Sequence, residues 1–141
     1  MLAANAGFYQ AIESGDLSLM SSVWADSDDV VCVHPGQVPV RGRGAVLRSW
    51  ALVMASASYI QFFLTDTSVA LYGAAAVVSC TENVLTGLDA PEDEPAGFAG
   101  GRAVATNVYV HTGSGWRLVA HHASPVLDHD EAGPARGDVA P

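Results

Sequence analysis

The sequence of 141 residues contains no lysine, so its six basic residues other than histidine are all arginines. Its 15 aspartates and glutamates outnumber them and give a formal net charge of −9. Binding to nucleic-acid phosphates or to an anionic membrane surface requires clustered basic side chains. The local group formed by Arg41, Arg43 and Arg48 is too small for a strong phosphate site. The charge balance therefore disfavours nucleic acid and membrane as partners.

The sequence also lacks an uncharged apolar run of the roughly 18 residues needed to span a bilayer. Its first residues, MLAANAGFYQAIESGDL, contain no basic segment like that of a secretory signal peptide. The two cysteines, Cys32 and Cys80, lie in apolar, strand-like segments. That context is typical of buried free thiols and not of a disulfide framework. We therefore expect a cytoplasmic protein without disulfides.

Half of the residues are hydrophobic, and the length suits one domain with a substantial core. In the first part of the chain, apolar residues recur every three or four positions over residues 3–15, 16–24 and 45–56, which predicts three helices. Gly15 suits the left-handed end of the first helix, and Asp16 suits the cap of the second.

The rest of the chain is rich in strand-like segments. A short one, VVCVH, spans residues 30–34 before a Pro-Gly turn. Four longer ones are divided by turn signals at Gly73 and at residues 113–115: YIQFFLTDTSVALYG, AAAVVSCTENVLTG, RAVATNVYVHTGSG and WRLVAHHASP. We predict an α+β fold in which three helices cover one face of a strongly curved, cone-shaped antiparallel sheet. The outer face, which is also apolar, is expected to form a homodimer.

Two segments are too polar for the core. Residues 87–101, GLDAPEDEPAGFAGG, are rich in proline, glycine and acid and predict a long, mobile loop. Residues 126–141 have no hydrophobic periodicity and predict a disordered tail. The expected organisation is therefore a single domain over residues 1–125, followed by this tail.

The order of these motifs resembles the nuclear transport factor 2-like superfamily, in its SnoaL-like branch. The resemblance covers residues 4–125 and depends on VCVHPG, RGR, SW, TENV, NVYV and GWRLVAHHASP occurring in that order. It implies a cone-shaped, cystatin-like fold that is usually dimeric and encloses an apolar pocket. Relatives include ketosteroid isomerase, scytalone dehydratase, polyketide cyclases and epoxide hydrolases, but also binding and association domains without known chemistry. The fold alone therefore does not decide the activity.

The last strand carries two adjacent histidines, which must point to opposite faces because neighbouring strand residues alternate. Strict alternation groups His122 with Leu118 and Ala120 on the apolar face, and His121 with Arg117 on the more polar face. We therefore predict that His122 faces the cavity and that His121 lies at the rim or in an interface. The alternative for His122 is a hydrogen-bonded core histidine that holds the sheet in register.

Glu82 interrupts a strand face that is otherwise apolar and includes Val78 and Cys80. Burial of a carboxylate among apolar side chains raises its pKa, which suits a general acid or base near neutral pH. The alternative is a structural bond to Arg102 or Arg117, or exposure to water.

Five further side chains complete the candidate pocket. Asn107 could orient a ligand carbonyl, hold the carboxylate in place or tie two strands together, and Tyr109 shares its strand face. His34 ends a strand beside a tight turn, where it could reach the cavity mouth or cap the turn. Tyr9 and Trp50 have the spacing of core aromatics and could also form pocket wall.

The sequence has no phosphate loop, dinucleotide fingerprint, nucleophile elbow or zinc-ligand spacing, so we expect neither a metal nor another cofactor. The leading hypothesis is a lyase (dehydratase) or isomerase that acts on a small apolar hydroxy- or keto-compound. His122 and Glu82 would exchange protons with it while Asn107 and a tyrosine orient it. One alternative is a pocket that binds a small ligand without converting it. Another is a dimeric association domain whose acidic residues 89–94 meet a basic partner.

Overall fold

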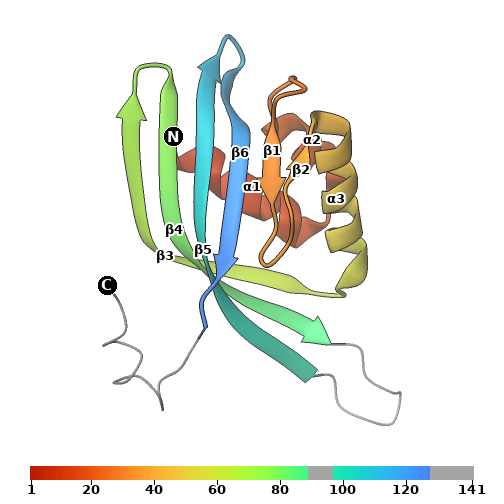
Figure 1. Ribbon diagram of the computed structural model, residues 1–141. Coiled ribbons are helices and arrows are strands. Elements are labelled where there is room, and N and C mark those ends of the chain that lie inside the picture. The colour runs from red at the N-terminus through yellow and green to blue at the C-terminus, as the bar shows by residue number, and fades with distance from the viewer. Residues whose placement is uncertain (89–96, 128–141) are drawn as a thin grey trace.

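The structure, a computed structural model, describes residues 1–88 and 97–127. Its elements in chain order are α1 (Leu2–Ser14), α2 (Leu17–Val23), β1 (Val31–Val33), β2 (Val40–Arg41), α3 (Arg43–Ser56), β3 (Ile60–Tyr72), β4 (Ala75–Leu88), β5 (Gly97–Thr112) and β6 (Gly115–Pro125). The three helices lie on one side of a strongly curved sheet that does not close into a barrel (Figure 1). No helix in these described ranges is long and apolar enough to cross a membrane.

The turn between α1 and α2 forms as the sequence predicts. Gly15 ends α1 in the left-handed conformation, with a φ angle of 64°. The carboxylate of Asp16 then accepts a hydrogen bond of 2.9 Å from the backbone N–H of Leu19 and so caps α2. Two residues therefore suffice to end α1 and begin α2.

The six strands form one sheet in the order β2-β1-β6-β5-β4-β3. The four long strands pair antiparallel with their neighbours in the chain, as their turn signals predict. In contrast, β1 pairs in parallel with β6, so the sheet is mixed and not wholly antiparallel. A parallel pair needs a long connection, and the segment from β2 through β5 provides it.

The prediction of a loop over residues 87–101 is wrong at both ends. β4 continues to Leu88 and β5 begins at Gly97, and the two strands pair along these extensions. The glycines of this segment still supply the backbone N–H and C=O groups that a strand ladder needs. The remaining residues 89–96 lie outside the described residues, as do residues 128–141 of the predicted tail.

The hydrophobic core lies between the helices and the concave face of the sheet. Phe8 of α1 is at its centre, and its ring packs edge-on against Trp24 at 6.4 Å and Trp50 at 5.5 Å. Met20 of α2 and Leu118 of β6 are fully buried beside these aromatics. These contacts attach all three helices to the sheet.

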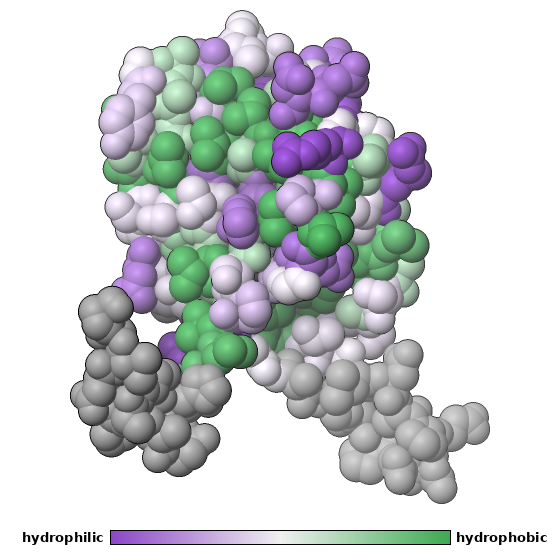
Figure 2. All heavy atoms as spheres, in the orientation of Figure 1, coloured by the Kyte–Doolittle hydropathy of each residue, from purple (hydrophilic) through white to green (hydrophobic). Residues whose placement is uncertain are grey.

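The convex face of the sheet is not covered by helices. It exposes large apolar side chains, of which Phe63 on β3 is 53% exposed and Val104 on β5 is 49% exposed. Figure 2 views this face and shows hydrophobic patches between polar side chains. Exposed apolar patches of this kind are typical of interaction surfaces.

Arg43 at the start of α3 has a structural role. Its guanidinium donates hydrogen bonds of 2.8 Å to the carbonyl oxygens of Ser21 and Trp24, and one of 3.2 Å to that of Ala25. It also donates to the Ser21 hydroxyl at 2.9 Å. These bonds satisfy carbonyl groups at and beyond the end of α2 that the helix itself leaves unpaired.

We expect Arg43→Lys to lower the free energy of unfolding by about 2 kcal/mol, because one ammonium group cannot replace the forked guanidinium at several acceptors. Urea unfolding followed by circular dichroism measures this change. Arg41→Lys, at an exposed position of the same RGR segment, is the control and is expected to change stability by less than about 0.5 kcal/mol. Equal losses in the two variants would contradict the role of Arg43.

Candidate functional site

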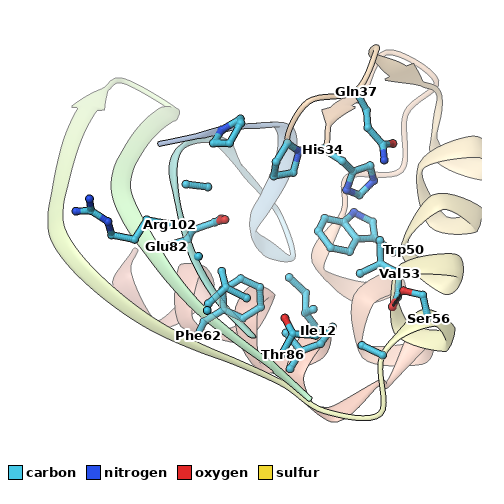
Figure 3. A pocket seen from close by; sticks show the side chains of 18 of the residues that line it. Ile12, His34, Gln37, Trp50, Val53, Ser56, Phe62, Glu82, Thr86 and Arg102 are labelled. Atoms are coloured by element: carbon cyan, nitrogen blue, oxygen red, sulfur yellow. Dashed lines mark hydrogen bonds between the residues drawn. The ribbon is translucent and has the colours of Figure 1, made fainter. Parts of the chain in front are cut away.

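A cavity of about 470 Å³ lies between the concave face of the sheet and helices α1 and α3. Its wall is mainly apolar, with Ile12 from α1, Trp50 and Val53 from α3, and Phe62 from β3 (Figure 3). Three titratable groups that are themselves buried also line it, namely His34, Glu82 and His121. A largely apolar cavity with a few convergent polar groups is the usual form of a small-molecule site.

The two adjacent histidines of β6 point the opposite way to the prediction. His121 is 2% exposed and lines the cavity, whereas His122 is exposed on the convex face. The prediction that His122 faces the cavity and that His121 lies at the rim or in an interface is therefore wrong.

A β-bulge in β6 explains this reversal. Val108 on β5 pairs with Ala120, but the next residue, Tyr109, pairs with Leu118. Val119 is thus an extra residue without a partner on β5. One inserted residue reverses the alternation of side chains along the rest of its strand. Both histidines follow the bulge, so each lies on the face that strict alternation assigns to the other.

Glu82 occupies the inner face of β4, where the alternation is uninterrupted. It follows the buried residues Val78 and Cys80, is 4% exposed and lines the cavity. Its Oε2 accepts a hydrogen bond of 2.6 Å from the Tyr9 hydroxyl. Burial raises the pKa of Glu82, and the hydrogen bond from Tyr9 offsets part of that rise.

Tyr9 of α1 lies behind Glu82 and does not line the cavity itself. Burial raises the pKa of its phenol, and the nearby Glu82 carboxyl adds to the rise. The phenol therefore stays protonated and can donate to the carboxyl. Its ring packs at 5.0 Å against Phe62, which does line the cavity.

Asn107 is fully buried on β5 and connects Tyr9 to His121. Its Nδ2 donates to the Tyr9 hydroxyl at 3.1 Å, and its Oδ1 lies 2.6 Å from His121 Nδ1. Because an amide oxygen only accepts hydrogen bonds, His121 Nδ1 carries the ring proton. Nε2 is therefore the unprotonated nitrogen of the neutral ring.

Asn5 of α1 fixes the orientation of the Asn107 amide. Its Oδ1 accepts hydrogen bonds from Asn107 Nδ2 at 3.0 Å and from the Tyr109 hydroxyl at 2.9 Å. A reversed Asn107 amide would place two carbonyl oxygens against each other. Asn5 is not among the residues that the sequence predicts for the site, although it is a polar residue on the apolar face of α1, four positions before Tyr9. Tyr109 does not line the main cavity, but borders a second hollow of about 330 Å³.

The environment of His121 keeps its ring neutral. Burial lowers the pKa of His121 to about 3, and repulsion from His34 and His122 contributes to the decrease. The rings of Phe8 and Trp50 pack against it at 5.0 and 5.7 Å. His121 is therefore an uncharged imidazole with a fixed tautomer.

His34 follows β1 and reaches the same cavity, where its ring lies 4.6 Å from that of Trp50. Its Nε2 is 2.9 Å from Ser49 Oγ, and the Ser49 hydroxyl donates its single proton to the Val46 carbonyl at 2.6 Å. With that proton on the carbonyl, Ser49 Oγ accepts from His34 Nε2–H, which also lies 3.6 Å from Cys32 Sγ, and Nδ1 is the unprotonated nitrogen of this tautomer. Burial lowers the pKa of His34 and favours its neutral form.

The remaining two of the five histidines do not belong to this site. His111 is exposed and packs against Trp116 at 4.9 Å, and His129 lies outside the described residues. Across residues 1–88 and 97–127, no three His, Cys, Asp or Glu side chains are grouped so that they could hold a metal ion.

The curved sheet over three helices is the cystatin-like fold of the nuclear transport factor 2-like superfamily. Within that superfamily, the SnoaL-like domain matches residues 1–128, and the chain belongs to this family.

Two solved structures are similar over most of their length. A candidate dehydratase of the nuclear transport factor 2-like family from Streptomyces avermitilis is 50% identical, with a TM-score of 0.84, and the match covers 89% of this chain and 94% of that one. A candidate calcium/calmodulin-dependent protein kinase type II association domain from Thiobacillus denitrificans is 30% identical, with a TM-score of 0.74 and the same coverage.

A third relative is the F-box protein SKIP8 from Arabidopsis thaliana, which is 25% identical over 131 residues. The match covers 93% of this chain and 52% of that protein, so the chain spans about half the length of this curated relative.

Proposed function

We propose that this protein is a cofactor-independent dehydratase (lyase) or isomerase that acts on a small apolar hydroxy- or keto-compound. The observation that supports this function is a continuous hydrogen-bonded chain from Glu82 through Tyr9 and Asn107 to His121. Both ends of this chain lie in the wall of one apolar cavity. A carboxyl whose pKa is raised and a neutral imidazole supply an acid and a base at one site. The similarity to a candidate dehydratase points the same way.

The proton transfers of a dehydration can be assigned to these two groups. His121 Nε2 takes a proton from the carbon next to the substrate carbonyl, and the electron pair of that bond forms the new C=C bond. The C–O bond of the leaving hydroxyl breaks, and Glu82 gives its proton to the departing oxygen, which leaves as water. One proton passed from the imidazolium to the carboxylate restores the starting state.

The network lowers the cost of charge formation during this reaction. His121 becomes an imidazolium while its Nδ1–H remains bonded to the Asn107 oxygen. Glu82 becomes a carboxylate that still accepts from the Tyr9 hydroxyl. The two charges arise together and have opposite signs, so the apolar cavity gains no net charge. An isomerase would use the same base and return the proton to a different carbon.

The test is a set of enolisable ketones and β-hydroxy ketones mixed with the purified protein in D2O without any added cofactor. We expect deuterium incorporation next to the carbonyl, measured by NMR, and the absorbance of a conjugated enone from the β-hydroxy compounds. Binding of these compounds without exchange or elimination would contradict catalysis and would favour the ligand-binding alternative.

We also propose that the convex face of the sheet pairs with a second copy of the chain. The exposed Phe63 and Val104 on this face support a homodimer, as does the similarity to a protein named as an association domain. His122 lies on the same face, where Thr106 is its partner on β5.

Val104→Glu is expected to convert a dimer into a monomer, because a two-fold interface would bring two buried carboxylates close together. Light scattering coupled to size-exclusion chromatography measures the mass, which should fall by half. Leu52→Glu, at an exposed position of α3 away from this face, is the control and should leave the mass unchanged. A wild-type protein that is already monomeric would refute the proposed interface.

A further inference from the structure

Two imidazole rings that line the cavity each have one unprotonated nitrogen. Asn107 holds the Nδ1–H of His121, and Ser49 holds the Nε2–H of His34. The other nitrogens, His121 Nε2 and His34 Nδ1, make no hydrogen bond to any residue in 1–88 or 97–127. Both rings line the same cavity. An unprotonated imidazole nitrogen accepts a hydrogen bond and cannot donate one.

The two rings are held on one side of the cavity by the same indole. Trp50 packs against His34 at 4.6 Å and against His121 at 5.7 Å. Figure 3 shows His34 and Trp50 on one side of the cavity and Glu82 and Phe62 on the other. The two acceptors therefore belong to one wall, and a ligand that fills the cavity faces both.

We propose that the ligand of this cavity is an uncharged compound with two hydroxyl groups, one donating to His34 Nδ1 and the other to His121 Nε2. This inference rests on the proposed function, because it names the substrate class of the same cavity. The hydroxyl donates to His121 Nε2 in the bound complex before reaction, and that hydrogen bond breaks before Nε2 takes the proton from carbon. A ligand with one hydroxyl would leave one buried acceptor unpaired, which weakens binding. The apolar side chains Ile12, Val53 and Phe62 match a carbon framework that carries the two hydroxyls.

Charge on the wall argues against an anionic ligand. A carboxylate or phosphate would face two nitrogen lone pairs, and burial keeps both rings uncharged. Arg102 also lines the cavity, but its guanidinium extends away from His34 and Trp50 in Figure 3. The side of the cavity that contains His34 and His121 therefore favours a ligand with uncharged hydrogen-bond donors.

The test compares a naphthalenediol with its monomethyl and dimethyl ethers, using isomers that differ in the separation of the two hydroxyls. Each methyl group removes one donor and keeps the carbon framework. For at least one isomer, we expect the Kd of the wild-type protein, measured by titration calorimetry, to rise about tenfold with each methyl group. Equal affinity for diol and ethers in every isomer would overturn the inference.

A variant shows whether His34 is one of the two acceptors. His34→Phe keeps an aromatic ring against Trp50 and removes the acceptor nitrogen. The hydroxyl that donates to His34 then has no partner, so methylating it should change the Kd of this variant by no more than about twofold. His111→Phe, at an exposed position outside the cavity, should retain the tenfold preference. A tenfold preference retained in His34→Phe would overturn the role of His34. The wild-type ligand series tests the inference even where this variant does not fold.

Binding and turnover separate this inference from the proposed function. Selective diol binding without exchange or elimination contradicts the enzyme and supports the inference. Turnover of a monohydroxy ketone, together with equal binding of diols and ethers, supports the enzyme and overturns the inference.

Discussion

His121→Gln is expected to reduce turnover by at least about 100-fold, whereas His122→Gln should retain it within about twofold. Glutamine can still donate to the Asn107 oxygen, so the buried network keeps a partner at this position. It has no basic nitrogen, and proton abstraction at Nε2 is lost. The measurement is kcat and kcat/KM for whichever ketone of the test set gives the fastest exchange or elimination.

This pair of variants changes adjacent residues by the same substitution, so they differ only in the face of β6 that they alter. His122 lies on the proposed dimer face, and the mass of both variants should therefore be measured alongside turnover. Loss of activity in His122→Gln with an unchanged mass, and retention in His121→Gln, would contradict the assignment of the base.

The free energy of unfolding is expected to fall steeply as the pH drops below about 6.5, because of His121. In the unfolded chain its imidazole has the ordinary pKa of 6.5, whereas burial lowers that pKa to about 3 in the folded protein. Between these values the unfolded chain binds a proton that the folded protein does not bind, so acid favours unfolding. The contribution of His121 to the free energy of unfolding is fully present above pH 6.5. As the pH falls below 6.5, this contribution is lost at up to about 1.4 kcal/mol for each pH unit.

Urea unfolding at several pH values between 7 and 4 measures this dependence. His121→Gln should show a much shallower slope than the wild type, while His111→Gln, at an exposed position, should follow the wild-type curve. Glu82 contributes with the opposite sign. Because its pKa is raised in the folded protein, its contribution is present at low pH and is lost as the pH rises through that pKa. Glu82 is unchanged in both variants, so their difference isolates His121; identical slopes would refute the expectation.

The elements of the fold could be predicted because their signals are local. Gly15 and Asp16 predict the turn between α1 and α2 from the chemistry of helix ends, and both perform that role. The inner-face position of Glu82 follows from simple alternation because β4 has no irregularity between Val78 and Glu82. The parallel pairing of β1 with β6 depends on segments far apart in the chain and has no local signal.

The error in the candidate site has one physical source. Val119 looks like an ordinary strand residue, since a β-branched apolar side chain fits either face of a sheet. Whether it is paired or bulged is decided by the register of β6 against β5, which no residue of β6 specifies alone. The role of Asn5 could not be predicted for a similar reason, because its hydrogen-bond partners Asn107 and Tyr109 lie far from it in the sequence.

The unpaired residue at position 119 has a consequence for evolution within this family. Loss of this single residue would make Ala120 follow Leu118 directly, and the pairing of Leu118, Ala120 and His121 with β5 would be kept by regular alternation. Two homologues that share the His-His dipeptide but differ by this one residue would therefore keep the same histidine of the pair in the interior. Interior positions of β6 are therefore comparable between homologues when position 119 is set opposite a gap and the later residues are matched by their partners on β5.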